Sequence, residues 1–426
     1  MKYLPAVVRL VYGLLLGVWL LVGRVTYAQP VPARSASLQL LPAGARLARV
    51  PVRVRRNLLL VPLILNGHGP FQFVLDTGVE TTILTDSAAR VALALPPGQP
   101  LLVEGAGEEA ALRAYWYERV QMTIPGAAIG EMPLTVLSGD ALQLSRYVGE
   151  PVAGLIGYDV FRAFVVEVRG ERPWLALHDP AQFRAPRKAA QLPLVLRAGK
   201  PYVRARVTQV AAAAALDTLT ATLLLDTGAG HALSLETGSH PALHLPAERR
   251  RAQLGRGLSG PVNGWLGRAQ NLELGPYRLR YPLVSFPDSA AARAKVRVPR
   301  QGTIGYETLK RFRVWFDYPG RGLWLRATGR LREPFEHDMS GLEIVARGAS
   351  FSSFVITHVE AGSPGDEAGL LPDDLLLAID GRSASEFSLT SLGLLLRSRD
   401  RRTVLLLVRR GTGDLIYTVL TLRRVI

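Results

Sequence analysis

The sequence predicts a mainly β protein built from two similar lobes, followed by a smaller domain of mixed strands and helices. The first observation is composition, because 41 Gly and 29 Pro separate short apolar runs, which is typical of many strands joined by tight turns. The second is an internal repeat of two short motifs, and the third is a change of pattern over roughly the last ninety residues. A chain of 426 residues is also too long for one ordinary core, so two or three domains are expected.

The N-terminal segment is predicted to be an export signal. Basic residues precede the uncharged, mostly apolar run 10–23, and Ala28 offers a small residue for cleavage. Arg24 is unusual in a cleavage region, so an uncleaved membrane anchor is the alternative, although 14 apolar residues are few for a span. We expect residues 1–28 to direct the protein to the periplasm, the cell surface or the medium, and residues 29–44 to be a linker or pro-segment.

The repeat defines the two lobes. FVLDTG ends at Gly78 and LLLDTG at Gly228, so the two Asp-Thr-Gly triplets lie 150 residues apart. A downstream Ile-Gly-Tyr recurs from Gly157 to Gly305, 148 residues apart. Because two different motifs recur at nearly the same spacing, 150 and 148 residues, the chain contains two homologous halves. The predicted bounds are 45–186 for lobe 1, 187–330 for lobe 2 and 338–426 for the C-terminal domain.

Each lobe is expected to be rich in strands. Asn66-Gly67 separates two apolar runs and predicts a hairpin, since both residues accept positive φ. Alternating apolar and polar residues over 202–208 predict a half-buried strand in lobe 2. Glycine-bearing segments at 103–116 and 254–265 predict one hairpin in each lobe, and apolar residues three apart after each Ile-Gly predict a short helix.

The doubled Asp-Thr-Gly, each with an Ile-Gly downstream, resembles the pepsin- and retropepsin-like aspartic proteases. The arrangement looks most like bacterial single-chain relatives that carry two retropepsin-like lobes, and the resemblance covers roughly residues 45–330. The resemblance implies a bilobal double β-barrel of the acid-protease type. It also implies that Asp76 and Asp226 meet at the centre as the catalytic pair of a peptide hydrolase.

Two carboxylates so placed have a definite chemistry. At ~4 Å and an effective dielectric of ~20, two full charges repel by about 4 kcal/mol, or roughly three pK units. The pair therefore shares one proton near neutral pH and titrates as a unit; pepsin is a standard example. The ionised group of Asp76 or Asp226 can deprotonate a water, while its protonated partner donates to the scissile carbonyl.

The residues beside the aspartates fit this resemblance. It implies that Thr77 and Thr227 cross-bond between the two loops, and that Gly78 and Gly228 let each loop turn tightly. It also implies an apolar support beneath the loops, made by Leu155-Ile156-Gly157 and Thr303-Ile304-Gly305.

Two features of the lobes leave questions open. The glycine segments would be flaps over a bound peptide, and the residues assigned to substrate binding there are Gly105, Trp116, Gly257 and Trp265. For each Trp, ordinary core or hairpin packing is the alternative. The first triplet is followed by Val79 and Glu80 where the family has Ala or Ser; Val79 could crowd the site, and we expect Glu80 to point to solvent.

The C-terminal sequence GSPGDEAGLLPDDLLLAIDGR resembles the middle of a bacterial PDZ domain, over roughly residues 340–426. Such a domain adds an extended peptide or C-terminus as a strand. We expect the groove at Phe354, Val355 and Ile356, facing a helix around 389–396. Asp373 replaces a habitual Gly and is expected to strain its turn. The Gly-rich carboxylate loop of the family is not clear in ARGASFSSF, so peptide binding and simple packing on the protease stay open.

Other site chemistries are excluded by the sequence. The chain has no Cys, which removes disulfides, thiolate metal sites and a Cys nucleophile. His240 and His244 flank a Pro without an HExxH motif, so no metal site and no cofactor are predicted. The formal charge is +16, but the Arg residues are scattered and no nucleic-acid module is present, so no nucleic-acid partner is expected.

The sequence thus leaves two hypotheses. The favoured one is an exported aspartic endopeptidase whose PDZ domain binds substrate or partner peptides, acting as a monomer because both lobes lie in one chain. The alternative is a catalytically weak peptide-binding scaffold that keeps the aspartic protease fold, with Val79-Glu80 as the damaging change.

Overall fold

Lobe 1 is a nine-stranded sheet in the computed structural model, which describes residues 38–426 apart from 104–110, 171, 211–214, 258–259 and 289–297. The predicted Asn66-Gly67 hairpin is confirmed: both residues have positive φ, at 46° and 81°, and Leu65 pairs with His68. The sheet order is β1-β9-β6-β10-β5-β4-β8-β7, with β3 paired to β4. Its elements are β1 (Gln39–Leu40), β3 (Arg53–Arg55), β4 (Leu58–Leu65), β5 (His68–Leu75), β6 (Thr82–Leu84), α2 (Ser87–Leu93), β7 (Gln99–Val103), β8 (Leu112–Ile124), β9 (Ala128–Leu137), α3 (Leu144–Val148), β10 (Gly154–Ile156) and α4 (Tyr158–Ala163).

Lobe 2 is a ten-stranded sheet with a related order, β18-β19-β22-β17-β23-β16-β15-β20-β21, and β14 pairs with β15. Its elements are β14 (Val195–Arg197), β15 (Lys200–Val210), β16 (Leu216–Asp226), β17 (Leu233–Leu235), η2 (Thr237–Ser239), β18 (Arg249–Gly257), β19 (Gly260–Arg268), β20 (Asn271–Leu274), β21 (Tyr277–Arg280), β22 (Leu283–Pro287), β23 (Gly302–Gly305) and α6 (Tyr306–Leu309). The strand at 202–208 expected from alternation lies inside β15.

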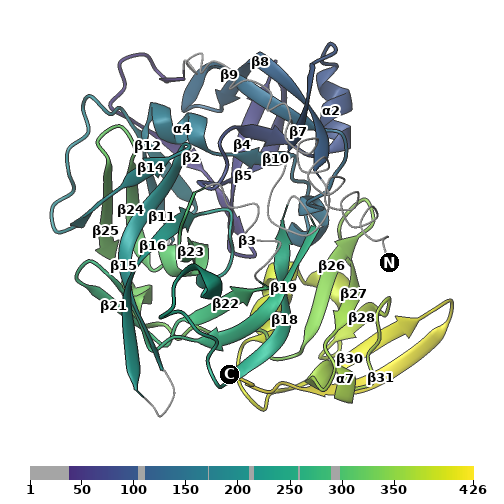
Figure 1. The fold of residues 1–426 in the computed structure, drawn as a ribbon. Coiled ribbons are helices and arrows are strands. Elements are labelled where there is room, and N and C mark those ends of the chain that lie inside the picture. Colours follow the sequence, from purple (N-terminus) through teal and green to yellow (C-terminus); the bar gives the residue numbers. More distant parts are fainter. Residues whose placement is uncertain (1–37, 104–110, 171, 211–214, 258–259, 289–297) are drawn as a thin grey trace, which may run out of the picture. The chain divides into compact units, whose positions relative to one another are not determined.

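The same three-strand unit recurs in both lobes. In lobe 1, β10 lies between β5, to which it is parallel, and β6, to which it is antiparallel; in lobe 2, β23 holds the same place between β16 and β17. Glycine begins each central strand, and a Cβ at Gly154 or Gly302 would overlap the neighbouring backbone carbonyl of Ile83 or Ser234. The internal repeat read from the sequence is therefore a repeat of topology, and the expected bilobal, mainly β fold is confirmed (Figure 1).

A six-stranded sheet joins the two halves. Its order is β13-β25-β24-β11-β12-β2, and β11 pairs antiparallel with β24, Val166 opposite Phe316. One apolar core runs through both lobes and this sheet. The strands are β2 (Leu47–Pro51), β11 (Val165–Arg169), β12 (Trp174–His178), β13 (Ala190–Pro193), β24 (Phe312–Asp317) and β25 (Gly322–Ala327).

The joining sheet also carries a buried carboxylate. Glu167 is 2% exposed and accepts hydrogen bonds from His178 at 2.9 Å and Arg313 at 2.6 Å, and it also pairs with Arg169. Burial alone would raise the pKa of Glu167, but these three partners together hold that pKa far below its ordinary range. The cluster is thus a charged, fully partnered group at the seam between the halves.

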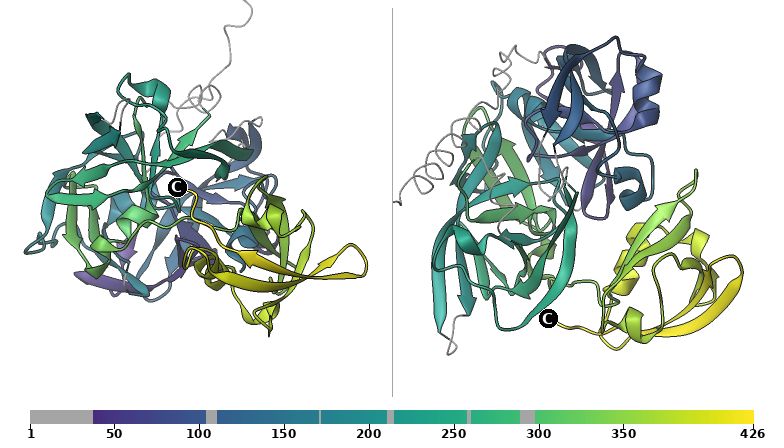
Figure 2. Two further views of the ribbon diagram at one scale, coloured as in Figure 1. Left: turned by 90° about the horizontal axis from the view of Figure 1, so that it is seen from below. Right: turned by 45° about the vertical axis from the view of Figure 1, so that its right-hand side comes forward.

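The C-terminal domain has its own sheet and its own apolar core. The sheet order is β26-β27-β28-β30-β31, with β29 paired to β28, and the β30–β31 hairpin extends beyond the rest of the sheet (yellow in Figure 2). After η3 (Gly329–Arg332), the elements are β26 (Leu342–Arg347), β27 (Ser353–Val359), α7 (Pro364–Glu367), β28 (Leu375–Ile379), β29 (Arg382–Ser383), η4 (Ala384–Glu386), α8 (Leu389–Leu396), β30 (Thr403–Arg410) and β31 (Asp414–Thr421). As expected, Asp373 is held in the left-handed region, with φ of 69°.

The predicted groove strand is wrong. Phe354, Val355 and Ile356 lie in β27, which has β26 on one side and β28 on the other, and their side chains are buried. A strand paired on both sides has no free edge to offer a peptide. The edge strands of this sheet are β26 and β31, and α8 lies against β26, so a strand added beside α8 would have to pair with Leu342–Arg347.

Residues 36–426 form one compact unit. The predicted export signal at 1–28 and most of the predicted linker at 29–44 lie outside the described residues. Among the residues that the structure describes, no helix is both long and apolar enough to cross a membrane.

Candidate active site

The two Asp-Thr-Gly triplets form matching turns at the ends of matching strands. Asp76 follows β5 and Asp226 ends β16, each beside the central strand of its three-strand unit. Each aspartate accepts a hydrogen bond from the backbone N–H of its own glycine: Gly78 N lies 2.6 Å from Asp76 Oδ1, and Gly228 N lies 2.9 Å from Asp226 Oδ1. These bonds orient both carboxyl groups in the same way.

The two carboxyl groups meet at the centre. A Cβ built on Gly78 would lie 3.0 Å from one carboxyl oxygen of Asp76 and 3.0 Å from one of Asp226, and a Cβ on Gly228 would overlap the Asp76 carboxyl group. Only glycine leaves room for the two carboxyl groups between the turns, which explains the third residue of each triplet.

The threonines cross-link the turns. Thr77 Oγ1 donates to Leu225 O at 2.7 Å and accepts from Thr227 N at 3.0 Å. Thr227 Oγ1 donates to Leu75 O at 2.7 Å and accepts from Thr77 N at 3.1 Å. Both threonines are buried, so these four bonds are shielded from water and fix one loop against the other.

The environment favours a proton on the pair. Burial, and then the neighbouring charge of Asp226 and its hydrogen bond, raise the pKa of Asp76 well above its ordinary value, while the Gly78 amide and the Lys200 charge oppose the rise. Tyr318, which follows β24, lies near both carboxyl groups: burial and then the charges of Asp76 and Asp226 raise its pKa. Burial and the neighbouring carboxylate therefore favour the protonated form of Asp76.

Two family models match parts of the chain. A family model for aspartyl protease matches residues 61–160, which include the first triplet, and a PDZ domain model matches residues 355–410. The chain contains an aspartyl protease domain and a C-terminal PDZ domain. No curated protein matches the sequence. Among solved structures, the crystal structure of basic 7S globulin from soybean matches with 11% identity and a TM-score of 0.41, over 66% of this chain and 95% of that one.

Beneath the aspartates, the protease fold places glycine where the backbone comes closest. A Cβ at Gly157 would overlap Asp76 O, and one at Gly305 would overlap His231 O. The preceding Ile156 and Ile304 are fully buried. The two Ile-Gly pairs therefore support the two aspartate loops from below, in the positions that the resemblance implies.

The two unusual residues after the first triplet do not point at the dyad. Val79 is 9% exposed and packs in an apolar cluster with Leu58, Val74 and Ile83. Glu80 is exposed, as expected, and forms an ion pair with Lys200 of lobe 2 at 3.3 Å. Lys200 is thereby held near Asp76, whose pKa its charge lowers.

The structure describes three of the four predicted flap residues. Gly105 lies outside the described residues, while Gly257 ends β18 opposite Gly260 in the β18–β19 hairpin. Trp116 lies in β8 between β7 and β9. Trp265 in β19 packs on the core beneath Arg249 and Arg251, whose guanidinium carbons lie 5.0 and 5.4 Å from the ring centre. A role in substrate pockets stays a prediction for both tryptophans.

Sequence reasoning missed three residues near the site. Tyr318 comes from the joining sheet, and no local pattern links it to the triplets. His231 follows the second triplet closely; burial lowers its pKa, and the charge of Asp226 opposes that shift. Asn57 donates to Gly230 O at 3.1 Å from lobe 1. The available signal was Asn57 itself, because Asn is common in turns with positive φ, and Arg56 and Asn57 form such a turn.

Within residues 38–426, outside the undescribed gaps, no group of three or more His, Cys, Asp or Glu side chains is arranged to hold a metal ion.

Proposed function

We propose that this protein is an exported aspartic endopeptidase, in which Asp76 and Asp226 activate a water molecule for attack on a peptide bond. The observation that carries the proposal is the convergence of two carboxyl groups, each fixed by its own glycine amide and jointly by the crossed threonine bonds. The aspartyl protease and PDZ matches support the same assignment.

The chemistry follows from one proton held by the pair. The ionised carboxylate takes a proton from the water, which attacks the scissile carbonyl, and the protonated carboxyl donates to the carbonyl oxygen. Burial favours the proton on Asp76, whose pKa is raised, so one acid and one base coexist at pH values where isolated aspartates would both be ionised. Both residues belong to one chain, so we propose that a monomer is sufficient.

Export is proposed from the sequence of residues 1–28, and peptide binding by the C-terminal domain from its family match. The substrate class is peptides or proteins. The scaffold alternative depended on damage by Val79 and Glu80, and the positions of these two side chains, one packed in apolar contacts and one paired with Lys200, give it no support.

The test is cleavage of a mixed peptide library from pH 3 to pH 8 by the purified mature protein, beside Asp76→Asn and Asp226→Asn. Loss of cleavage in both variants, with inhibition of the parent by a statine-type transition-state mimic, is the expected result. Cleavage that survives either substitution, or no cleavage by the parent at any pH, would contradict the proposal.

A further inference from the structure

The β26 edge of the PDZ sheet is covered by lobe 1. Helix α3 lies against both β26 and α8, the two elements that border the groove, and the β3–β4 turn lies beside it. Gly149, just after α3, is so close to the groove helix that a Cβ there would lie 3.5 Å from Leu389 Cβ. In this structure the protease domain thus occupies the place where a peptide would add to β26.

Arg56 makes the central contact. Its guanidinium donates to Ile344 O of β26 at 3.0 Å and to Tyr147 O of α3 at 3.2 Å, and it stacks on the Tyr147 ring at 4.2 Å. Its backbone N–H donates to Thr390 Oγ1 of α8 at 3.2 Å. A carbonyl on an edge strand is the acceptor that an added peptide strand needs. Arg56 therefore takes a bond that a peptide would otherwise make.

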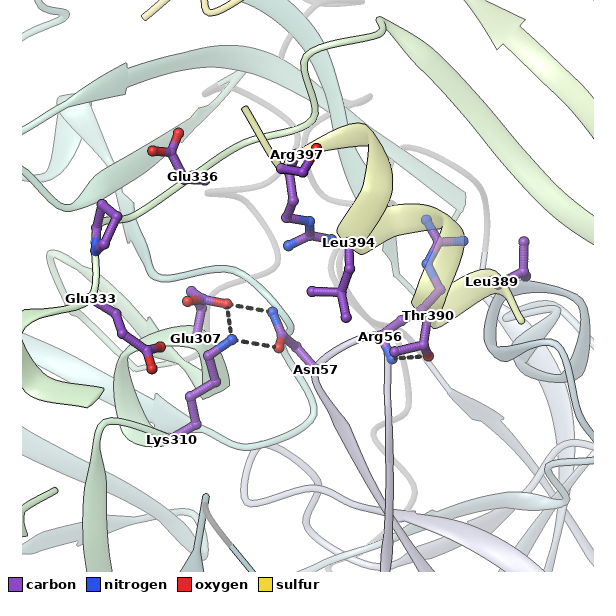
Figure 3. A pocket seen from close by; sticks show the side chains of 12 residues that line it. Arg56, Asn57, Glu307, Lys310, Glu333, Glu336, Leu389, Thr390, Leu394 and Arg397 are labelled. Atoms are coloured by element: carbon purple, nitrogen blue, oxygen red, sulfur yellow. Dashed lines mark hydrogen bonds and ion pairs between the residues drawn. The ribbon is translucent and has the colours of Figure 1, made fainter. Parts of the chain in front are cut away.

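The next residue, Asn57, reaches the active site. Its side-chain amide donates to Gly230 O at 3.1 Å, two residues beyond the second Asp-Thr-Gly triplet, and to Glu307 Oε2 at 2.7 Å. Lys310 Nζ donates to Asn57 Oδ1 at 3.1 Å. Figure 3 shows Asn57 bonded to Glu307 and Lys310 on one side of a cavity of about 320 Å³, with α8 on the other.

The turn that carries these contacts is strained. Arg56 and Asn57 have φ of 46° and 61°, in the left-handed region that Asn accepts and Arg disfavours. A two-residue hairpin turn with both φ values positive is short and stiff, so the two side chains cannot move independently over large distances. Strain of this kind persists where surrounding contacts hold it.

We propose that the Arg56–Asn57 turn couples the PDZ groove to the second aspartate loop. A peptide that pairs with β26 must displace Arg56 from Ile344 O, and the turn then loosens the hold of Asn57 on Gly230. Asn57 acts as a positioning residue for the Asp226 loop, and groove occupancy regulates it. The effect on catalysis rests on the proposed proteolysis, whereas the capping of the groove does not.

A disulfide lock tests the capping without any ligand. The chain has no Cys, so Gly149→Cys with Leu389→Cys introduces the only pair, and a Cβ separation of 3.5 Å lies at the short end of the disulfide range. Gly149 has φ of 84°, so Cys there carries backbone strain, but this strain is the same with and without Arg56→Asn and does not affect the comparison of the two rates. We expect the bond to form under mild oxidation, and to form at least tenfold more slowly when Arg56→Asn is added. Asn suits the positive φ and removes the guanidinium, so the turn itself is kept. No cross-link, or an equal rate with Arg56→Asn, overturns the proposal.

Peptide binding gives the second readout. The probe is a pool of fluorescein-labelled decapeptides with five randomised C-terminal positions, followed by anisotropy. The reduced double-Cys protein should bind and the oxidised form should not, and Arg56→Asn should bind at least tenfold more tightly than the parent, because a capped groove lowers apparent affinity. Arg382→Asn, an exposed site paired within the domain to Glu386, is the matched control. Equal binding by both redox forms, or no binding by Arg56→Asn, overturns the proposal.

Catalysis supplies the third readout. Asn57→Gly keeps the turn but removes the amide, so kcat should fall at least threefold while KM stays within twofold. Saturating peptide should lower kcat of the reduced double-Cys protein at least threefold and leave the oxidised form unchanged. Equal effects on both redox forms contradict the coupling. A protein without proteolytic activity would refute the proposed function, while the cross-linking and anisotropy results would still decide the capping.

Discussion

Replacing Thr227 with Val should destabilise the protease lobes strongly, although the side chains are nearly the same size. Its hydroxyl donates to Leu75 O at 2.7 Å and accepts from Thr77 N at 3.1 Å, in a site with 0% exposure. Val leaves a carbonyl and an N–H buried without these partners. At about 1–3 kcal/mol for each of the two buried groups left unsatisfied, the loss in unfolding free energy should be roughly 2–6 kcal/mol in total.

The mirror position provides an internal check. Thr77 makes the equivalent bonds, to Leu225 O at 2.7 Å and from Thr227 N at 3.0 Å, so Thr77→Val should cost a similar amount. Thr→Ser at either position keeps the hydroxyl and should cost less than about 1.5 kcal/mol, chiefly for the lost methyl group.

Guanidinium denaturation followed by Trp fluorescence measures this directly. No Trp lies beyond residue 324, so the signal reports the protease lobes and not the PDZ domain. The linear dependence of unfolding free energy on denaturant gives the difference between variants. If Thr227→Val matched Thr227→Ser within 1 kcal/mol, the crossed bonds would not be holding the loops together.

Three other predictions concern charge. Burial and the charge of Asp226 raise the pKa of Asp76, so the contribution of Asp76 to stability is present at low pH and is lost as pH rises through the folded pKa. The Tm of Asp76→Asn minus the Tm of the parent should therefore increase from pH 4 to pH 7. A Tm difference that stays constant over this range would contradict the prediction. Lys200→Met removes a charge that lowers that pKa, so both limbs of the pH–activity profile should move to higher pH, whereas unmoved limbs would show that Lys200 does not act on the dyad. The backbone N–H groups of Ser340 and Gly341, just before β26, already donate to Asp338 Oδ1 at 2.9 and 3.2 Å, so they are occupied and do not bind the C-terminal carboxylate of a groove peptide. Amidating that C-terminus should therefore change the affinity measured by anisotropy by less than threefold. A tenfold loss of affinity would contradict this.

The centre of the site could be predicted from sequence because the repeat doubles the evidence. One Asp-Thr-Gly is a common turn, but two at a matching offset, each with its own Ile-Gly, indicated a symmetric pair before any coordinates. The positions of Asp76, Asp226 and both threonines in the structure follow that pattern. The domain bounds stay a prediction.

The sequence did not reveal which strands lie next to one another in a sheet. Phe354 to Ile356 have the composition of a groove strand, yet whether a strand is an edge depends on its pairing partners, and this one pairs with β26 on one side and β28 on the other. Tyr318 and Asn57 reach the dyad region only through folding of the joining sheet and the β3–β4 turn. Such contacts between distant segments leave no periodic signal in the chain.

The pH dependence of kcat/KM tests the shared proton most directly. The parent should give a bell-shaped profile with its maximum on the acid side of neutral and two apparent pKa values that belong to the aspartate pair. Activity that stays level up to pH 9 would show that no proton is held between Asp76 and Asp226 during turnover.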